Sequence, residues 1–160
     1  MAKLLSVAVA VVVFIGFGAA RAGEPSSHTM MTPDQIKWGE APPVLPAGAK
    51  LAVMTGDPSK EGGIYVLRLK MPANYKIAAH THPVEEHVTV LSGAFLMGMG
   101  DKLDATKTKA FPAGSFATMP ANVAHYAVTK KETIIEIAGV GPFAMTYVNP
   151  ADDPSKAAKK

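Results

Sequence analysis

The chain has 160 residues, of which 48% are hydrophobic and 18% are charged. This length accommodates one domain with a hydrophobic core of its own. The absence of cysteine excludes disulfide bonds and thiolate metal ligands. The formal net charge of +3 falls to +1 without Lys3 and Arg21 of the N-terminal segment, so the charge gives no indication that the protein binds nucleic acid.

The N-terminal residues are typical of an export signal. Lys3 precedes an apolar run over residues 4–17, and small residues occupy both positions that a signal peptidase recognises in Ala20-Arg21-Ala22. This pattern predicts a signal peptide over residues 1–22, cleaved after Ala22, and a periplasmic or secreted bacterial protein with no membrane span after cleavage. An uncleaved anchor is the alternative, because residues 4–20 are nearly long enough to cross a bilayer.

Residues 23–49 are rich in proline, serine and small residues, which predicts an extended lead-in with at most one helical turn near Thr32. Residues 149–160 are small or charged and are expected to form a flexible C-terminal tail. Between them, residues 50–148 contain short β-rich runs separated by turn signals, which predicts an all-β sandwich or barrel. The expected strands are 50–55, 64–71, 77–82, 87–91, 94–99, 116–119, 124–129, 133–138 and 143–148.

A cluster of metal-ligating residue types lies within this all-β region. His80 and His82 are two residues apart, so on an extended strand their rings project from the same face. Glu86 can add a carboxylate oxygen, and His125 can add a third nitrogen from a distant strand. The set predicts one divalent transition metal ion, which can be iron, manganese, nickel, copper or zinc. A lone His-x-His pair is more often only a solvated polar pair, so the prediction depends on the surrounding pattern.

The neighbouring residues Glu85 and His87 are poor ligand candidates. Successive side chains of a strand point to opposite faces, so both should face away from the ion if Glu86 faces it.

The surrounding pattern resembles the two motifs of the cupin family. The first motif has a glycine, then His-x-His, a glutamate and a second glycine, and it matches His80, His82, Glu86 and Gly93. The second has a glycine, then Pro-x-Gly, a histidine and an asparagine, and it matches Gly114, Pro120 and His125. Three positions depart from the motifs, since Asn74 and Asn122 replace glycines and Thr129 replaces the closing asparagine. Asparagine tolerates left-handed backbone, so Asn122 is expected to fill the turn of the missing glycine.

The resemblance implies a single cupin barrel, also called a double-stranded β-helix or jelly roll, over residues 50–148. It also implies a metal site and a homodimer formed through outward barrel faces. Alternation along the strands predicts an apolar lining around the metal, although the same side chains can be simply the barrel core. The predicted lining residues are Val88, Phe95, Met97, Met99, Met119, Val123 and Ala127.

Several functions are compatible with a site of three histidines and one glutamate. Cupins with similar ligand sets include dioxygenases, oxalate-degrading enzymes, germin-like proteins and isomerases. One interpretation is a metal-dependent, dioxygenase-like oxidoreductase that acts on a small molecule. A second is a non-catalytic cupin that binds metal or a small ligand, for example in a stress response, and a third is a metal-dependent decarboxylase or isomerase. No catalytic residue beyond the four ligands is predicted, which favours oxygen chemistry or binding. A purely structural ion is a further alternative.

Overall fold

The computed structural model describes residues 28–157, and the regular secondary structure in them is mostly β-strand. The predicted signal peptide, residues 1–22, lies outside the described residues. The strands are β1 Gly39–Glu40, β2 Lys50–Thr55, β3 Ile64–Met71, β4 Lys76–Thr81, β5 Glu86–Ser92, β6 Ala94–Met99, β7 Lys109–Pro112, β8 Phe116–Met119, β9 His125–Thr129, β10 Thr133–Val140 and β11 Thr146–Tyr147.

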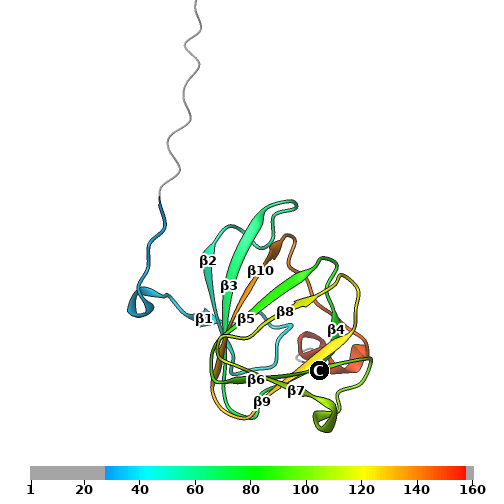
Figure 1. The fold of residues 1–160 in the computed structure, drawn as a ribbon. Coiled ribbons are helices and arrows are strands. Elements are labelled where there is room, and N and C mark those ends of the chain that lie inside the picture. The colour runs from blue at the N-terminus through cyan, green and yellow to red at the C-terminus, as the bar shows by residue number, and fades with distance from the viewer. Residues whose placement is uncertain (1–27, 158–160) are drawn as a thin grey trace, which may run out of the picture.

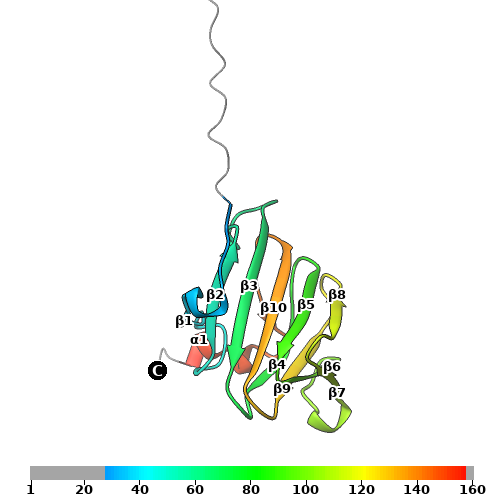
Figure 2. The ribbon, with the colours of Figure 1, turned by 60° about the vertical axis from the view of Figure 1, so that its left-hand side comes forward.

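Two antiparallel sheets face each other and enclose the core (Figure 1). The first sheet has the strand order β1-β2-β3-β10-β5-β8, and Figure 2 shows its five longer strands side by side. The second has the order β11-β4-β9-β6-β7. Several neighbouring strands are distant in sequence, as β3 and β10 are, because from β3 onward the chain passes repeatedly from one sheet to the other. This arrangement is the jelly-roll barrel that the sequence predicted.

Alternation of side chains explains why the barrel is closed around an apolar interior. Along β3 the buried positions are Tyr65, Leu67, Leu69 and Met71, and the residues between them are only partly buried or exposed. One face of the strand therefore points into the core, as expected for a half-buried strand. The core also contains Leu45, Ala49, Tyr75, Ile77, Val88, Val90, Phe95, Met97, Met119, Ala127, Ile135 and Ile137.

Helical structure is limited to short segments in the described part of the chain. The 3₁₀ turns are η1 Pro33–Gln35, η2 Ala105–Lys107 and η3 Pro150–Asp152, and α1 is a single turn over Pro154–Ala157. The turn η1 lies where the sequence predicted one near Thr32. The turns η3 and α1 lie in the expected C-terminal tail, where Asn149 and Asp153 accept hydrogen bonds from the backbone that follows them. No helix among residues 28–157 is long and apolar enough to cross a membrane.

The last predicted strand, residues 143–148, is mostly not a strand. Within this range only β11 pairs with another strand, which is β4. Residues 141–145 have no regular secondary structure. Pro142 has no N–H to donate to a neighbouring strand. The N–H of Phe143 donates instead to the carbonyl of Pro58, which lies in the turn between β2 and β3. Sequence reasoning also missed β7, which pairs with β6 and is ended by Pro112.

The two asparagines that replace motif glycines adopt left-handed backbone. Asn74 has φ 61° and Asn122 has φ 62°. Asparagine is one of the few residues that tolerate this region. The expectation for Asn122 is confirmed, because this asparagine adopts the left-handed backbone that glycine would otherwise supply.

Candidate metal centre

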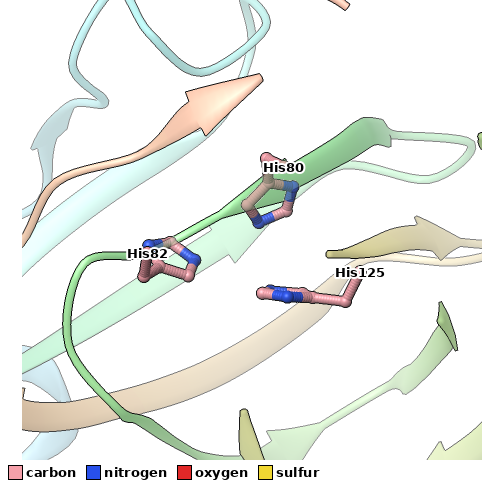
Figure 3. Close-up of side chains that lie close together, drawn as sticks. All are labelled: His80, His82 and His125. Atoms are coloured by element: carbon pink, nitrogen blue, oxygen red, sulfur yellow. The ribbon is translucent and has the colours of Figure 1, made fainter. Parts of the chain in front are cut away.

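Three histidine rings meet between the two sheets (Figure 3). His80 lies on β4, His82 directly follows the end of β4, and His125 begins β9. Strands β4 and β9 are neighbours, and His80 is paired with His125 across them. The three residues each offer one ring nitrogen, and these nitrogens all lie within 4.8 Å of one another. All three side chains are at most 4% exposed.

Backbone carbonyls fix the orientation of all three rings. The Nδ1 atom of His80 lies 2.7 Å from the carbonyl of Ala78, and that of His125 lies 3.0 Å from the carbonyl of Val123. The Nδ1 atom of His82 lies 2.7 Å from the carbonyl of Ala144. A carbonyl oxygen only accepts, so each Nδ1 carries a hydrogen and donates it. In the neutral rings the lone pair is therefore on Nε2, which is the state a metal ligand requires.

The same burial keeps the rings neutral. Burial and, to a lesser degree, the nearby His125 lower the pKa of His80 to about 3. Burial lowers the pKa of His82 to about 4 and also shifts the pKa of His125 downward. Removal from water disfavours the charged imidazolium, so protons do not compete with a metal ion for Nε2 near neutral pH.

Glu86 faces the histidines from the other sheet, where it begins β5. Its Oε2 atom lies 3.6 Å from Nε2 of His82 and 3.7 Å from Nε2 of His125. Burial raises the pKa of Glu86 to about 7. With both Nε2 atoms unprotonated, three lone-pair atoms point toward one another. A cation between them would remove this repulsion, and ligands about 2.1 Å from a tetrahedral ion are about 3.4 Å apart.

An apolar cavity of about 30 Å³ adjoins the histidines and Glu86. A cavity needs about 10–15 Å³ to hold one water molecule, so this one accommodates an ion with a few small ligands. Among residues 28–157, its lining contains no ionisable side chain besides the four candidate ligands. The other lining residues are Leu45, Leu51, Leu69, Ile77, Val88, Phe95, Met97, Ala127, Ile135, Ile137, Phe143 and Met145.

The predicted lining residues fall into two groups. Val88, Phe95, Met97 and Ala127 line the cavity, and Met119 is buried in the core next to it. Met119, Met99 and Val123 all lie outside the lining, and the last two do not belong to the core either, so the prediction was wrong for them.

Met99 ends β6 beside His125, and 56% of its side chain is exposed. Val123 is 37% exposed because β9 begins only at His125, so the alternation of a strand does not extend back to it.

Sequence reasoning missed the role of the segment between β10 and β11. Phe143 stacks on His82 with ring centroids 5.3 Å apart and an interplanar angle of 22°. The carbonyl of Ala144 accepts the hydrogen bond from His82, and Met145 lines the cavity. These residues have no motif, and their contacts cross about sixty positions of sequence.

Glu85 and His87 lie away from the site. Both side chains are substantially exposed, and they form a surface ion pair with 3.1 Å between Nε2 of His87 and Oε1 of Glu85. The alternation argument placed both residues on this outer face.

The donor set fits a transition metal ion. The Nε2 atom of His82 is buried without any hydrogen-bond partner among the described residues. A buried polar atom without a partner costs free energy, so an orphaned nitrogen aimed at two imidazoles and a carboxylate is the arrangement that an ion would satisfy. Three imidazole nitrogens and one carboxylate suit zinc, iron, manganese, nickel or copper.

Replacement of Glu86 by glutamine is expected to weaken metal binding about tenfold or more, because a neutral amide replaces the only anionic ligand. Titration of the metal-free protein with Zn²⁺ in competition with a chromogenic chelator measures the change. Glu85→Gln is the matched control and should bind as the wild type does. The reverse result would assign the carboxylate ligand to Glu85.

Solved structures with the same fold include proteins of diverse origin. The polyketide cyclase RemF from Streptomyces resistomycificus is 14% identical, with a TM-score of 0.63, and the match covers 84% of this chain and 94% of that one. A candidate acetylacetone dioxygenase from Methylibium petroleiphilum is 19% identical, with a TM-score of 0.61 and coverage of 83% and 89%. An RmlC-like cupin from Shewanella frigidimarina is 16% identical, with a TM-score of 0.54 and coverage of 71% and 91%. A comparison with curated proteins finds no match.

The two facing sheets with the histidine triad between them have the cupin fold, so the fold predicted from the two sequence motifs is confirmed. A family model also identifies the family of the chain. A family model described as a domain of unknown function, DUF4437, matches residues 25–146, and the chain belongs to this family.

Proposed function

We propose that this protein is an exported metalloprotein that holds one divalent transition metal ion through His80, His82, His125 and Glu86. We further propose that it is a dioxygenase-like oxidoreductase of a small molecule. The observation that carries the proposal is the set of three buried imidazoles. Each donates Nδ1–H to a carbonyl, and the Nε2 atoms of His82 and His125 lie beside the buried Glu86 carboxylate. The N-terminal pattern of residues 1–22 supports export.

The residues around the ligands support small-molecule chemistry in a dry site. A bound iron or manganese ion would supply redox chemistry, whereas zinc would act as a Lewis acid. Phe143 covers one face of His82, and the rest of the cavity lining is apolar, so the buried candidate ligands have little contact with bulk water. The carbonyls at Nδ1 hold the rings in place, so little reorganisation is needed when an ion binds.

The lining favours an oxidoreductase over a decarboxylase or isomerase. Decarboxylation or isomerisation requires an acid or base near the reacting atoms. Among the described residues that line the cavity, only the four candidate ligands are ionisable. The similar fold of a candidate acetylacetone dioxygenase suggests a small diketone as the first compound to test.

One observation favours a second candidate function, which is the binding of a metal ion without turnover. The cavity of about 30 Å³ accommodates water-sized ligands beside the ion, and a diketone would need more room than this. A protein that only holds an ion needs no more space than this.

Elemental analysis and oxygen uptake test the proposal on residues 23–160, purified without a tag or chelator. We expect about one equivalent of iron or manganese, and oxygen uptake when acetylacetone or a related small diketone is added. His80→Ala, purified in parallel, gives the background of adventitious ions. One equivalent of metal without oxygen uptake on any compound of the panel would favour binding alone. A wild type that contains no metal and takes up none would overturn the metal site.

A further inference from the structure

Tyr65 is a buried tyrosine whose hydroxyl has no hydrogen-bond partner among the described residues. The side chain is 0% exposed, so water does not reach it from the surface. An unpaired buried hydroxyl is destabilising, and a phenylalanine of the same shape would avoid this cost. Two further buried tyrosines do not share the problem, since Tyr75 donates to the carbonyl of Pro46 and Tyr147 donates to that of Val44.

The sheet register places Tyr65 next to the metal centre. Tyr65 of β3 is paired with Gly139 of β10, and Gly139 is paired with Glu86 of β5. Paired residues of antiparallel strands project from the same face, so Tyr65 and Glu86 flank the glycine on the inner side of the sheet. Neighbouring strands are about 4.8 Å apart, so the two residues are about 10 Å apart at the backbone.

Because Gly139 has no side chain, nothing from this residue lies between the side chains of Tyr65 and Glu86. The Tyr65 hydroxyl lies 2.6 Å from the place where a Cβ of residue 139 would stand, so the ring leans over the middle strand toward Glu86. Any side chain at position 139 would displace the hydroxyl. The pKa of Tyr65 is raised to about 12 by burial and, to a lesser degree, by the nearby charge of Glu86, which agrees with this placement.

Glu86 lacks the support that the histidines have. Each histidine has a carbonyl partner for Nδ1, whereas no hydrogen bond to the Glu86 carboxylate is found among residues 28–157. Ligating carboxylates are commonly oriented by a hydrogen bond from a neighbouring group. The Tyr65 hydroxyl is a donor without an acceptor, and Glu86 is an acceptor without a donor.

We infer that Tyr65 is a positioning residue for the metal centre, whose hydroxyl donates to the Glu86 carboxylate when the ion is bound and holds it in its ligating orientation. The inference rests on the proposed function, because it requires that Glu86 is a ligand. A tyrosine that served packing alone would be replaceable by phenylalanine without any effect on the ion.

Tyr65→Phe tests the inference through metal affinity and metal-free stability. We expect Co²⁺ to bind about tenfold more weakly to the variant, which is the lower end of the effect usual for residues that orient ligands. The visible absorption bands of the bound Co²⁺ are expected to shift as the carboxylate moves. The Tm of the metal-free variant should equal or exceed that of the wild type, because the unpaired hydroxyl is removed.

Tyr75→Phe is the matched control. It also removes one buried tyrosine hydroxyl, but one that has a backbone partner away from the cavity lining. Its Tm should fall, and its Co²⁺ affinity should match the wild type. An equal affinity loss in both variants would attribute the effect to general stability and overturn the inference.

A double-mutant cycle with Glu86→Gln shows whether Tyr65 acts through the carboxylate. The loss of Co²⁺ affinity caused by Tyr65→Phe is expected to disappear in the Glu86→Gln background, because the effects of replacing two interacting residues are not additive. Additive losses, or an unchanged affinity in the single variant, would overturn the inference while the metal site itself stands. A wild type that binds no Co²⁺ would instead overturn the proposed function.

Discussion

Replacement of His125 by alanine is expected to weaken metal binding at least about 100-fold. Structural metal sites with four ligands contribute about 10–16 kcal/mol, so one ligand contributes about 3 kcal/mol, and each 1.4 kcal/mol is tenfold in affinity. His125 also supplies the only candidate ligand from β9, so its loss leaves the ion open on that side. Competition of the metal-free protein with a chelator of known affinity measures the change, and His82→Ala should give a loss of the same order.

His87→Ala is the control for this loss. His87 lies one residue from Glu86 but points outward, and its partner is the exposed Glu85. Its replacement should leave the affinity within about twofold of the wild type, because a surface ion pair contributes little to the fold. A loss in His87→Ala as large as that in His125→Ala would place the ion on the outer face of β5.

The fold could be predicted because its determinants are local. The glycines, asparagines and histidines of the two motifs each act within a few residues, as the left-handed backbone of Asn74 and Asn122 shows. The spacing of His80 and His82 places both rings on one face without knowledge of the rest of the chain. These features identify the barrel and bring three histidines together.

The closure of the site could not be predicted because it depends on contacts between distant segments. The acceptor for His82 is a backbone carbonyl at residue 144, and any residue type can supply a carbonyl. Phe143 stacks on the same ring, but nothing in its neighbouring sequence distinguishes it from a core residue. The prediction that Met99 and Val123 line the cavity was wrong for a related reason. Alternation of side chains applies only inside a strand, and both residues lie at or beyond a strand end.

The position of Tyr65 beside the metal centre could not be predicted from the sequence. In β3 it occupies an ordinary inward position, and alternation predicts only that it is buried. Its proximity to Glu86 follows from the pairing of β10 with both β3 and β5, which no local pattern reveals. Long-range register therefore decides which core residues lie near the metal centre.

Replacement of Gly93 by alanine is expected to destabilise the protein by about 3 kcal/mol or more. Gly93 forms the turn between β5 and β6 with φ +82°, where a side chain is strained. An added Cβ would also lie 2.4 Å from the carbonyl oxygen of Glu132 and 2.7 Å from Cα of Thr133. Both contacts are with backbone, so a rotamer change cannot relieve them. Thermal unfolding of the metal-free protein should show a Tm lower by about 10 °C.

Gly114→Ala separates the two causes of this loss. Gly114 is the first glycine of the second motif and has a similar φ of +87°, but nothing lies within 4 Å of the place where a Cβ would stand. Its replacement should therefore cost only the backbone strain, about 1 kcal/mol. Equal losses in the two variants would mean that conformational freedom alone explains both motif glycines. A larger loss of stability for Gly93→Ala would show why the first motif requires glycine at this position. The start of β10 packs directly against the turn between β5 and β6 and leaves no space for a side chain.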